Sequence, residues 1–359
     1  MRSSFSTGIL MKSILKISVK PNTKISEAIL KLRKTGDQCL LVVDKNLNLL
    51  GTLTDGDLRL PIVRGINLNN SIEKFYNKKP KTLKEKDLNN KILVTELFTK
   101  YGINIIPVVN KKKLIKIITW SDFFSKKEGP KPDFDLVIMA GGKGTRLLPF
   151  TKVLPKPLIP INDKPIISHI LNFFKKGNLK NTWITVNFKS NILKSYLNST
   201  EKRIKIEYIN EKKPLGTIGS VGLIPEKKIS KNFIVTNCDI LLDEPLNKIL
   251  EYHNNQQSDM TVVVVKKKYK IPYGTCVIGA KGNFLKLVEK PEYSFFVNTG
   301  FYIMNKRLIK FIQKNKYQDI NEFINKIKKL NKKINCYPIT EKSWKDFGQW
   351  EEYFNETKN

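Results

Sequence analysis

A cluster of glycines and polar residues directly after an apolar run makes residues 135–157 suited to holding an anionic ligand. The run 135–140 predicts a buried strand, and the residues after it that could contact a ligand are Gly141, Gly142, Gly144, Thr145, Arg146 and Lys156. Glycine adopts backbone angles closed to other residues, so N–H groups of such a loop can converge on phosphate oxygens. Arg146 and Lys156 add the positive charge that a triphosphate requires. We therefore predict a polyphosphate site, although the loop is no Walker motif, because no Gly-Lys-Ser/Thr follows.

The elements around this loop predict an α/β sheet. Apolar strand candidates alternate with amphipathic segments, at 135–140, 182–187, 204–209 and 232–236 for strands and 166–177 and 190–198 for helices. Such alternation is typical of a doubly wound, mostly parallel sheet, which binds ligands beyond the carboxyl ends of its strands. The glycine loop falls at that edge.

Further polar residues follow later strands. Gly216 could let its backbone approach a flat base closely, and Thr217 could offer a hydroxyl, or the segment could be only a turn before a helix. Asp239 ends the apolar run 233–238. A carboxylate at a strand end of such a sheet faces the ligand cleft, although an aspartate there can also cap a helix.

Taken in order, these segments resemble the motifs of the sugar-1-phosphate nucleotidyltransferases. The resemblance covers the C-terminal two-thirds of the chain and rests on residues 139–157, 211–219, 233–239, 273–274, 289–291, 298–300 and 344–348. It implies a Rossmann-like sheet of the nucleotide-diphospho-sugar transferase type. It also implies in-line attack by a sugar-1-phosphate oxygen on the α-phosphorus of a nucleoside triphosphate, with release of pyrophosphate. That reaction needs charge neutralisation and alignment rather than a protein nucleophile.

The resemblance also assigns residue roles. Nucleotide contacts fall to Ala140, Gly141, Gly142, Gly144, Thr145, Arg146, Glu211, Gly216 and Thr217, and sugar contacts to Gly274, Glu289, Lys290, Asn298 and Gly300. Mg²⁺ is expected on Asp239 and Asp346, since two carboxylates brought together repel unless a cation lies between them. The residues expected to carry catalysis are Arg146, Lys156, Asp239 and Lys290. The chain departs from the family pattern at Ile218, where a small residue is usual, and at Gln349-Trp350, where Thr-Pro is common.

The first third of the chain contains an internal repeat. Residues 39–57 and 105–122 each read as strand, turn, strand and then Thr-x-x-Asp at a helix start, with amphipathic helices expected around 25–34 and 88–101. The pattern resembles a pair of CBS modules, which implies a regulatory α+β domain that can bind AMP or ATP. The candidate nucleotide residues are Thr54, Asp57, Thr119 and Asp122, and the alternative is that they only cap helices. Lys116 and Trp120 make the second half-site the poorer candidate.

These patterns predict a tandem CBS domain at 1–125, with repeats at about 11–68 and 72–125. A Gly/Pro-rich linker at 126–134 and a transferase domain at 135–359 follow. Residues 1–10 lack the hydrophobic stretch of a signal peptide, and Met1 and Met11 are both candidate start residues. We expect a homo-oligomer.

The composition limits the classes of partner that the chain is expected to bind. The formal charge is +33, but only seven of the 65 basic residues are Arg and the lysines are scattered, so no basic stripe for nucleic acid forms. The four cysteines show no metal-ligand spacing and fit reduced thiols, and no apolar run is long enough for a membrane span. We therefore expect a cytoplasmic protein without nucleic-acid or membrane partners.

Three functional hypotheses stay open from the sequence. Joining a CBS pair to this transferase resembles guanylyltransferases that use GTP to make bacterial surface-polysaccharide or nonulosonic-acid sugars, with glucosamine-1-phosphate as one candidate substrate. A uridylyl- or thymidylyltransferase of the same fold is the first alternative. A non-catalytic nucleotide-sensing regulator is the second, and magnesium-dependent pyrophosphate release would separate it from both enzymes.

Overall fold

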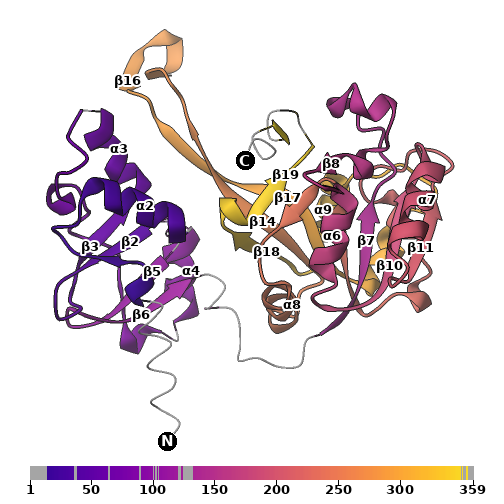
Figure 1. The fold of residues 1–359 in the computed structure, drawn as a ribbon, viewed down its shortest axis with the longest axis horizontal. Helices are drawn as coiled ribbons and strands as arrows, with labels where there is room; N and C mark the ends of the chain where they lie inside the picture. Colours follow the sequence, from indigo (N-terminus) through magenta and orange to yellow (C-terminus); the bar gives the residue numbers. More distant parts are fainter. Residues whose placement is uncertain are drawn as a thin grey trace, which may run out of the picture. The chain divides into compact units, whose positions relative to one another are not determined.

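The computed structural model divides the chain into two compact units, residues 1–124 and 125–359 (Figure 1). It describes residues 14–35, 39–63, 65–88, 90–99, 101, 103, 105–119, 123, 132–348, 350 and 353–354. The division falls just before residue 126, where the expected Gly/Pro-rich linker begins.

The first unit contains two three-stranded sheets with one topology. In each sheet the first strand is parallel and the third strand antiparallel to the middle one. The strands are β1 (Ser18–Val19), β2 (Cys39–Val43) and β3 (Leu49–Thr54) in one sheet, and β4 (Leu83–Lys84), β5 (Ile105–Asn110) and β6 (Lys113–Thr119) in the other. The helices are α2 (Ile25–Thr35), α3 (Asp55–Val63) and α4 (Lys91–Thr99). The helix–strand–strand part of the sequence repeat is therefore present twice, as α2-β2-β3 and α4-β5-β6, while the residues after Thr119 that would begin the second closing helix lie largely outside the described residues.

The second unit is built on a seven-stranded mixed sheet in the order β11-β10-β7-β12-β17-β14-β18. The strands are β7 (Asp133–Met139), β10 (Asn178–Val186), β11 (Ile206–Asn210), β12 (Asn232–Asn237), β14 (Met260–Lys270), β17 (Glu292–Asn305) and β18 (Ile334–Ile339). The pairs on either side of β17 are antiparallel and the other pairs are parallel. This confirms the mostly parallel α/β fold.

Helices cover both faces of this sheet, as a doubly wound fold requires. They are α6 (Ile166–Phe174), α7 (Ser190–Thr200), α8 (Leu246–Asn255) and α9 (Ile320–Lys329). Neighbouring residues of a strand point to opposite faces, and Phe301 stacks on Phe174 of α6 at 5.9 Å while Tyr302 joins the core that contains Phe323 of α9. The two helices therefore lie on opposite sides of β17.

A buried carboxylate fixes the start of β7. Asp135 is fully buried, and its two oxygens accept the backbone N–H groups of Asn181 at 3.0 Å and of Ser230 at 2.7 Å. Hydrogen bonds of this kind offset the cost of burying charge. They tie the strand that leads to the glycine loop to segments on two sides.

A two-stranded sheet lies beside the large one and joins distant parts of the chain. It pairs β13 (Ile240–Leu242), just after β12, with β19 (Trp344–Asp346) near the C-terminus. None of the helices described is both long and apolar enough to cross a membrane. All four cysteines carry free thiols.

The buried His253 near the end of α8 predicts acid sensitivity of the second unit. Burial lowers the pKa of its imidazole to about 4, while the unfolded chain titrates near 6.5. Below pH 6.5 the unfolded state gains a proton that the folded state does not, so stability falls as the pH drops from 6.5 towards 4. We expect a loss of about 2 kcal/mol in the free energy of unfolding between pH 7 and pH 5.

Thermal unfolding at the two pH values measures this loss. In His253→Gln the pH dependence should largely disappear, because the titrating group is gone. An equally large fall in the variant would assign the acid sensitivity to other groups.

Candidate active site

The glycine loop follows the carboxyl end of β7, and one of its residues has a left-handed backbone conformation. Gly144 has a φ of 66°, and a Cβ there would lie 2.8 Å from Cγ2 of Thr151. The Thr151 hydroxyl donates to the Gly144 carbonyl at 3.0 Å. Any larger residue at position 144 would strain this turn. Thr145 and Arg146 follow in a short 3-10 helix (Thr145–Leu147), with both side chains exposed.

Glu211 supports the same loop. It directly follows β11, which lies two strands away from β7 in the sheet. A Cβ on Gly141 would lie 2.6 Å from the Glu211 Oε1 atom, so any side chain at position 141 would have to displace the Glu211 carboxylate. The Leu215 backbone N–H donates to Oε2 at 3.2 Å, and burial raises the pKa of this carboxyl group. The structure therefore brings Glu211 against the glycine loop, as a shared nucleotide site requires.

Lys156 and Asp239 form a nearly buried ion pair. Lys156 begins a 3-10 turn (Lys156–Leu158), and Asp239 follows the end of β12 next to β7. Their side chains are 11% and 8% exposed, and the ammonium donates to Oδ2 of Asp239. The Coulomb attraction in a pair so shielded from water is stronger than at the surface, but desolvation of the two charges offsets much of it.

Pairing of β13 with β19 brings Asp346 to the same place. Ile240 stands opposite Asp346, and the Phe347 N–H donates to the Asp239 carbonyl at 2.8 Å. A Cβ built on Gly348 would lie 2.6 Å from Oδ2 of Asp239 and 2.8 Å from Oδ1 of Asp346, with the Lys156 ammonium 3.4 Å away. Two carboxylates and one ammonium therefore surround a single point, and we call Lys156, Asp239 and Asp346 the charged cluster.

The residues expected to contact the nucleobase are positioned mainly by packing. Gly216 has a φ of 76°, and its missing side chain leaves room for the Gln318 carbonyl, 2.5 Å from an ideal Cβ. The Thr217 hydroxyl accepts the Ile320 N–H at 2.8 Å and so caps α9. Ile218 is fully buried in the core. Its large side chain therefore supports the loop from inside rather than facing a ligand.

Asn298 and Gly300 lie on β17, just before the part of that strand that pairs with β12. The Asn298 side chain donates to the Tyr302 hydroxyl at 2.7 Å and accepts the Gly300 N–H at 3.0 Å. Gly300 has a φ of 79°, and its open side faces the Asn237 amide, 2.5 Å from an ideal Cβ. Asn237 ends β12 two residues before Asp239, and no sequence pattern pointed to it.

Gly274, Glu289 and Lys290 lie instead on a projecting hairpin. Residues 266–296 extend beyond the sheet as an arm whose tip is formed by β15 (Thr275–Ile278) and β16 (Phe284–Val288) (Figure 1). Glu289 lies beside Gly274, with Oε2 3.0 Å from an ideal Cβ there. The Lys290 ammonium forms an ion pair with Glu289, 4.0 Å from its Oε1 atom. The structure brings these three residues together but places them apart from the charged cluster.

Aromatic residues near the C-terminus hold the glycine loop from outside. The Trp350 indole donates to the Leu148 carbonyl at 2.9 Å, and the Tyr353 hydroxyl donates to Pro160 at 2.8 Å. Phe150 packs on Trp350 at 5.0 Å between ring centres. No sequence pattern indicated this support, because Gln349-Trp350 stands out in the sequence only as a departure from a motif.

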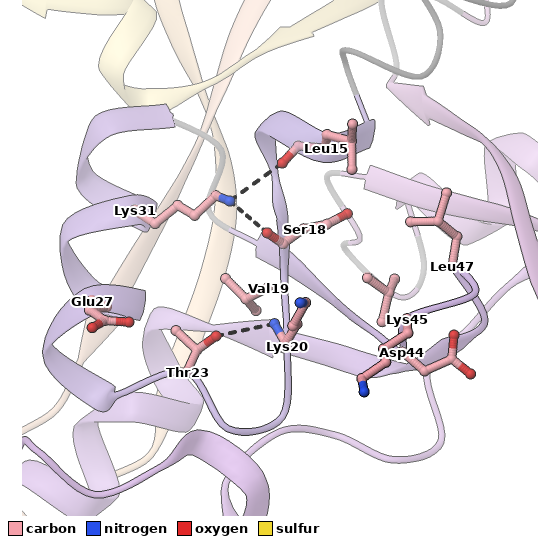
Figure 2. A pocket seen from close by; sticks show the side chains of 11 residues that line it. Leu15, Ser18, Val19, Lys20, Thr23, Glu27, Lys31, Asp44, Lys45 and Leu47 are labelled. Atoms are coloured by element: carbon pink, nitrogen blue, oxygen red, sulfur yellow. Dashed lines mark hydrogen bonds between the residues drawn. The ribbon is translucent and has the colours of Figure 1, made fainter.

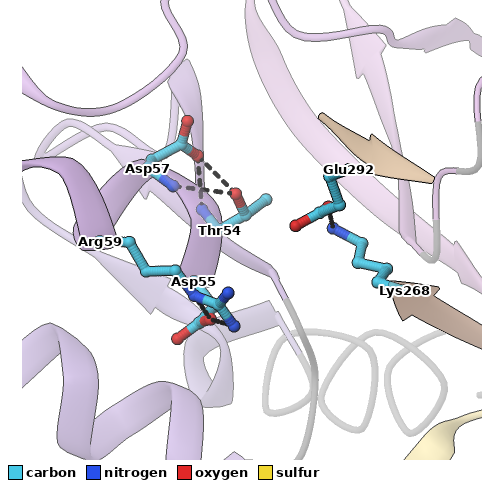
Figure 3. Close-up of polar contacts among 6 residues, drawn as sticks. All are labelled: Thr54, Asp55, Asp57, Arg59, Lys268 and Glu292. Carbon is cyan, nitrogen blue, oxygen red and sulfur yellow. Dashed lines mark hydrogen bonds and ion pairs between the residues drawn. The ribbon is translucent and has the colours of Figure 1, made fainter. Parts of the chain in front are cut away.

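In the first unit Thr54 and Asp57 form hydrogen bonds with each other. Oδ2 of Asp57 accepts both the Thr54 N–H and the Thr54 hydroxyl at 2.7 Å, and the pair caps the start of α3 (Figure 3). This is the capping role considered for the motif. Thr119 ends β6, and Asp122 lies outside the described residues.

A separate cavity of about 470 Å³ lies elsewhere in this unit, between β1, α2 and the turn after β2 (Figure 2). Lys31 of α2 crosses it and donates to the Ser18 carbonyl at 2.6 Å. Thr54 and Asp57 are not among its lining residues. The sequence motifs did not point to this cavity.

The fold and the site define a Rossmann-like α/β transferase domain of the nucleotide-diphospho-sugar type. The model of the nucleotidyl transferase family matches residues 136–359, which is more than half of the chain. The chain therefore belongs to the nucleotidyl transferase family. The CBS domain model matches residues 10–63, in the first of the two repeats.

Curated relatives and solved structures agree with this assignment. The catalytic subunit beta of mannose-1-phosphate guanylyltransferase from Danio rerio is 34% identical over 184 residues, 49% of this chain and 51% of the relative. The same subunit from Dictyostelium discoideum is 32% identical over 225 residues, 61% of this chain and 62% of the relative. The chain thus spans about half the length of the relatives it resembles.

Among solved structures, HddC from Yersinia pseudotuberculosis matches with a TM-score of 0.50 at 25% identity, over 63% of this chain and 98% of HddC. A putative glucose-1-phosphate thymidylyltransferase from Bacillus anthracis matches with the same score at 20% identity, over 63% of this chain and 94% of its own. This second likeness concerns the fold alone.

Proposed function

We propose that the chain transfers a nucleotidyl group from a nucleoside triphosphate to a sugar 1-phosphate. A phosphate oxygen of the sugar attacks the α-phosphorus, the bond to the β-phosphate breaks, and pyrophosphate leaves. The charged cluster at the edge of the glycine loop carries this proposal. It supplies what the transfer needs, which is fixed charge at the reacting phosphates.

The chain's own residues bind and align the substrates in this account. Backbone N–H groups of residues 141–144 and the Arg146 guanidinium hold the triphosphate. The Lys156 ammonium exchanges Asp239 for a phosphate oxygen when the triphosphate enters. Glu211 and the Gly216–Thr217 turn form the side of the site nearest the base, and Asn298 and Gly300 form the side nearest the sugar.

The charged cluster also fits a divalent cation. Asp239 and Asp346 would hold it, because their oxygens face one point and carboxylate oxygen is the ligand that Mg²⁺ prefers. Among the described residues, no group of three or more His, Cys, Asp or Glu side chains is placed to hold a metal ion. A site with two carboxylates suits Mg²⁺, which usually takes its other ligands from water and substrate phosphates. When bound, the ion would neutralise charge on the reacting phosphates.

We further propose GTP and a hexose 1-phosphate as the substrates. The relatives named above are called mannose-1-phosphate guanylyltransferases, and HddC was also solved in complex with GMP-PN. Mannose 1-phosphate is therefore the first sugar to try, and glucosamine 1-phosphate the second. The uridylyl and thymidylyl alternatives would use UTP or dTTP in place of GTP, with the 211–219 loop proposed to select the base.

The first unit is proposed to regulate this reaction through an adenine nucleotide. A CBS match and a repeated sheet topology support that role. We place the activity in the cytoplasm, where nucleoside triphosphates are abundant.

One matrix tests the proposed substrates. Pyrophosphate release is measured with each of four triphosphates against several hexose 1-phosphates, in Mg²⁺, with and without AMP. We expect release with GTP and a hexose 1-phosphate to exceed every other combination by at least about tenfold, the scale of one lost binding contact. A higher rate with UTP or dTTP would reassign the base, and an unchanged matrix with AMP would remove AMP as the regulator.

A further inference from the structure

Residues 144–159, which carry Arg146 and Lys156, have little secondary structure of their own, and we call them the cation loop. Their regular elements are 3-10 turns of three residues each, at Thr145–Leu147, Phe150–Lys152 and Lys156–Leu158. Turns so short have poor hydrogen-bond geometry and hold a shape weakly by themselves. Leu148 is 44% exposed and Val153 is 70% exposed, so part of the loop lies outside the core. The loop therefore needs support from another segment to keep its shape.

Aromatic side chains near the end of the chain provide that support. The indole N–H of Trp350 donates to the Leu148 carbonyl at 2.9 Å, and its ring centre lies 5.0 Å from that of Phe150. The Tyr353 hydroxyl donates at 2.8 Å to the carbonyl of Pro160, directly after the loop. Tyr353 itself is buried. Two residues about two hundred positions further along the chain thus hold the cation loop at three points.

The same C-terminal segment also builds the charged cluster. β19 ends at Asp346, four residues before Trp350. The Phe347 N–H donates to the Asp239 carbonyl at 2.8 Å, and β19 pairs with β13. Residues 344–353 therefore contact the strand end that carries Asp239 in one place and the cation loop in another. This segment sets the position of the loop relative to the cluster.

The two cations of the loop depend on this support to different degrees. Lys156 is 11% exposed and has its own ion pair with Asp239. Arg146 is exposed and lies two residues before Leu148, whose carbonyl Trp350 holds. A displacement of about 1 Å in a group that aligns a substrate can slow a reaction by about 10²-fold. Loosening the contact at Leu148 would therefore move Arg146 first.

We propose that Trp350 is a positioning residue for nucleotidyl transfer, which keeps the Arg146 guanidinium aligned on the triphosphate by holding the Leu148 carbonyl. This inference rests on the proposed function for the role of Arg146. The anchoring of the loop by Trp350 rests on the contacts alone. Trp350 stands where the chain departs from the family pattern, so the family motif does not supply this role.

Hydrogen–deuterium exchange tests the anchor without any substrate. Trp350→Phe keeps an aromatic ring but removes the N–H donor. Amides that close turns of the loop, such as those of Leu148 and Lys152, should exchange about fivefold faster than in the wild type, the scale of one lost hydrogen bond. Peptides from β7 and β12 should exchange at the wild-type rate. Unchanged exchange in the loop would rule out the anchor.

Steady-state kinetics tests the positioning role. Trp350→Phe should lower kcat/KM for the triphosphate by about fivefold, and Trp350→Ala by about 10²-fold, while KM for the hexose 1-phosphate stays at the wild-type value. A general loosening of the fold would instead lower the fraction of active enzyme and leave both KM values unchanged. Faster exchange in the loop with unchanged kcat/KM for the triphosphate would overturn the positioning role.

Tyr208→Phe is the matched control for these variants. It removes an aromatic donor that bonds Asn198 at 3.0 Å on the edge strand β11, and it should change neither kcat/KM nor exchange in the loop. A loss as large as that of Trp350→Phe would mean that any lost aromatic hydrogen bond has this effect, and the specific role would be wrong.

A double variant tests whether Trp350 acts through Arg146. In an Arg146→Ala background, Trp350→Phe should cause no further loss of kcat/KM for the triphosphate, because the group that it positions is absent. A further fivefold loss would contradict the proposal. If the wild-type chain turns over no triphosphate, the proposed function fails, while hydrogen exchange still decides on the anchor.

Discussion

Replacing Asp239 by Asn should reduce turnover by at least about 10²–10³-fold while the fold persists. The change removes the charge that pairs with Lys156 and, together with Asp346, would hold the divalent cation. Asn keeps the side chain's volume, so the structural cost is limited to the ion pair. Steady-state pyrophosphate release measures the loss, and circular dichroism checks the fold.

Asp243→Asn is the matched control for this change. Asp243 lies four residues further along the same segment with an exposed side chain, and its replacement should leave turnover unchanged. If Asp239→Asn kept more than about a tenth of wild-type turnover, its role as a metal ligand would be wrong.

Replacing Lys156 by Met should have the second largest effect. The ammonium pairs with Asp239 and lies 3.4 Å from the Gly348 Cβ position that both carboxylates approach, and we expect its loss to lower kcat/KM for the triphosphate by about 10²-fold or more. Asp239 would also lose its buried partner, which destabilises a shielded carboxylate. The melting temperature of the variant should therefore fall together with its activity. If Lys156 had a purely structural role, only the melting temperature would fall.

Lys152→Met separates a specific effect from loss of positive charge on the loop. Lys152 is exposed on the same loop, so its replacement should change kcat/KM little. A variant at Lys156 with normal kcat/KM for every triphosphate would exclude contact with the phosphates.

Local sequence patterns predicted the parts of the site that depend on neighbouring residues. The glycine loop is a break in an apolar run, and Asp239 is an acid at the end of another. The structure places both at adjacent strand ends, because β7 and β12 are parallel neighbours. The repeat in the first unit was visible for the same reason, since each copy is a short local pattern.

Local patterns could not predict features that depend on distant pairing. The antiparallel direction of β17 follows from which strands meet in the sheet, and no local pattern encodes it. The approach of Asp346 to Asp239 was expected only from the family resemblance, because it requires β19 to pair with β13, about a hundred residues away. Lys290 illustrates the opposite case, because its motif is plain in the sequence but its arm leads away from the cluster.

The product balance tests the central claim most directly. Wild-type chain, GTP, a hexose 1-phosphate and Mg²⁺ are combined, and pyrophosphate and sugar nucleotide are both quantified. The account predicts equal amounts of the two products, no pyrophosphate when the sugar phosphate is left out, and neither product with Asp239→Asn. Pyrophosphate formed without a sugar nucleotide, or no product with any of the four triphosphates, would contradict it.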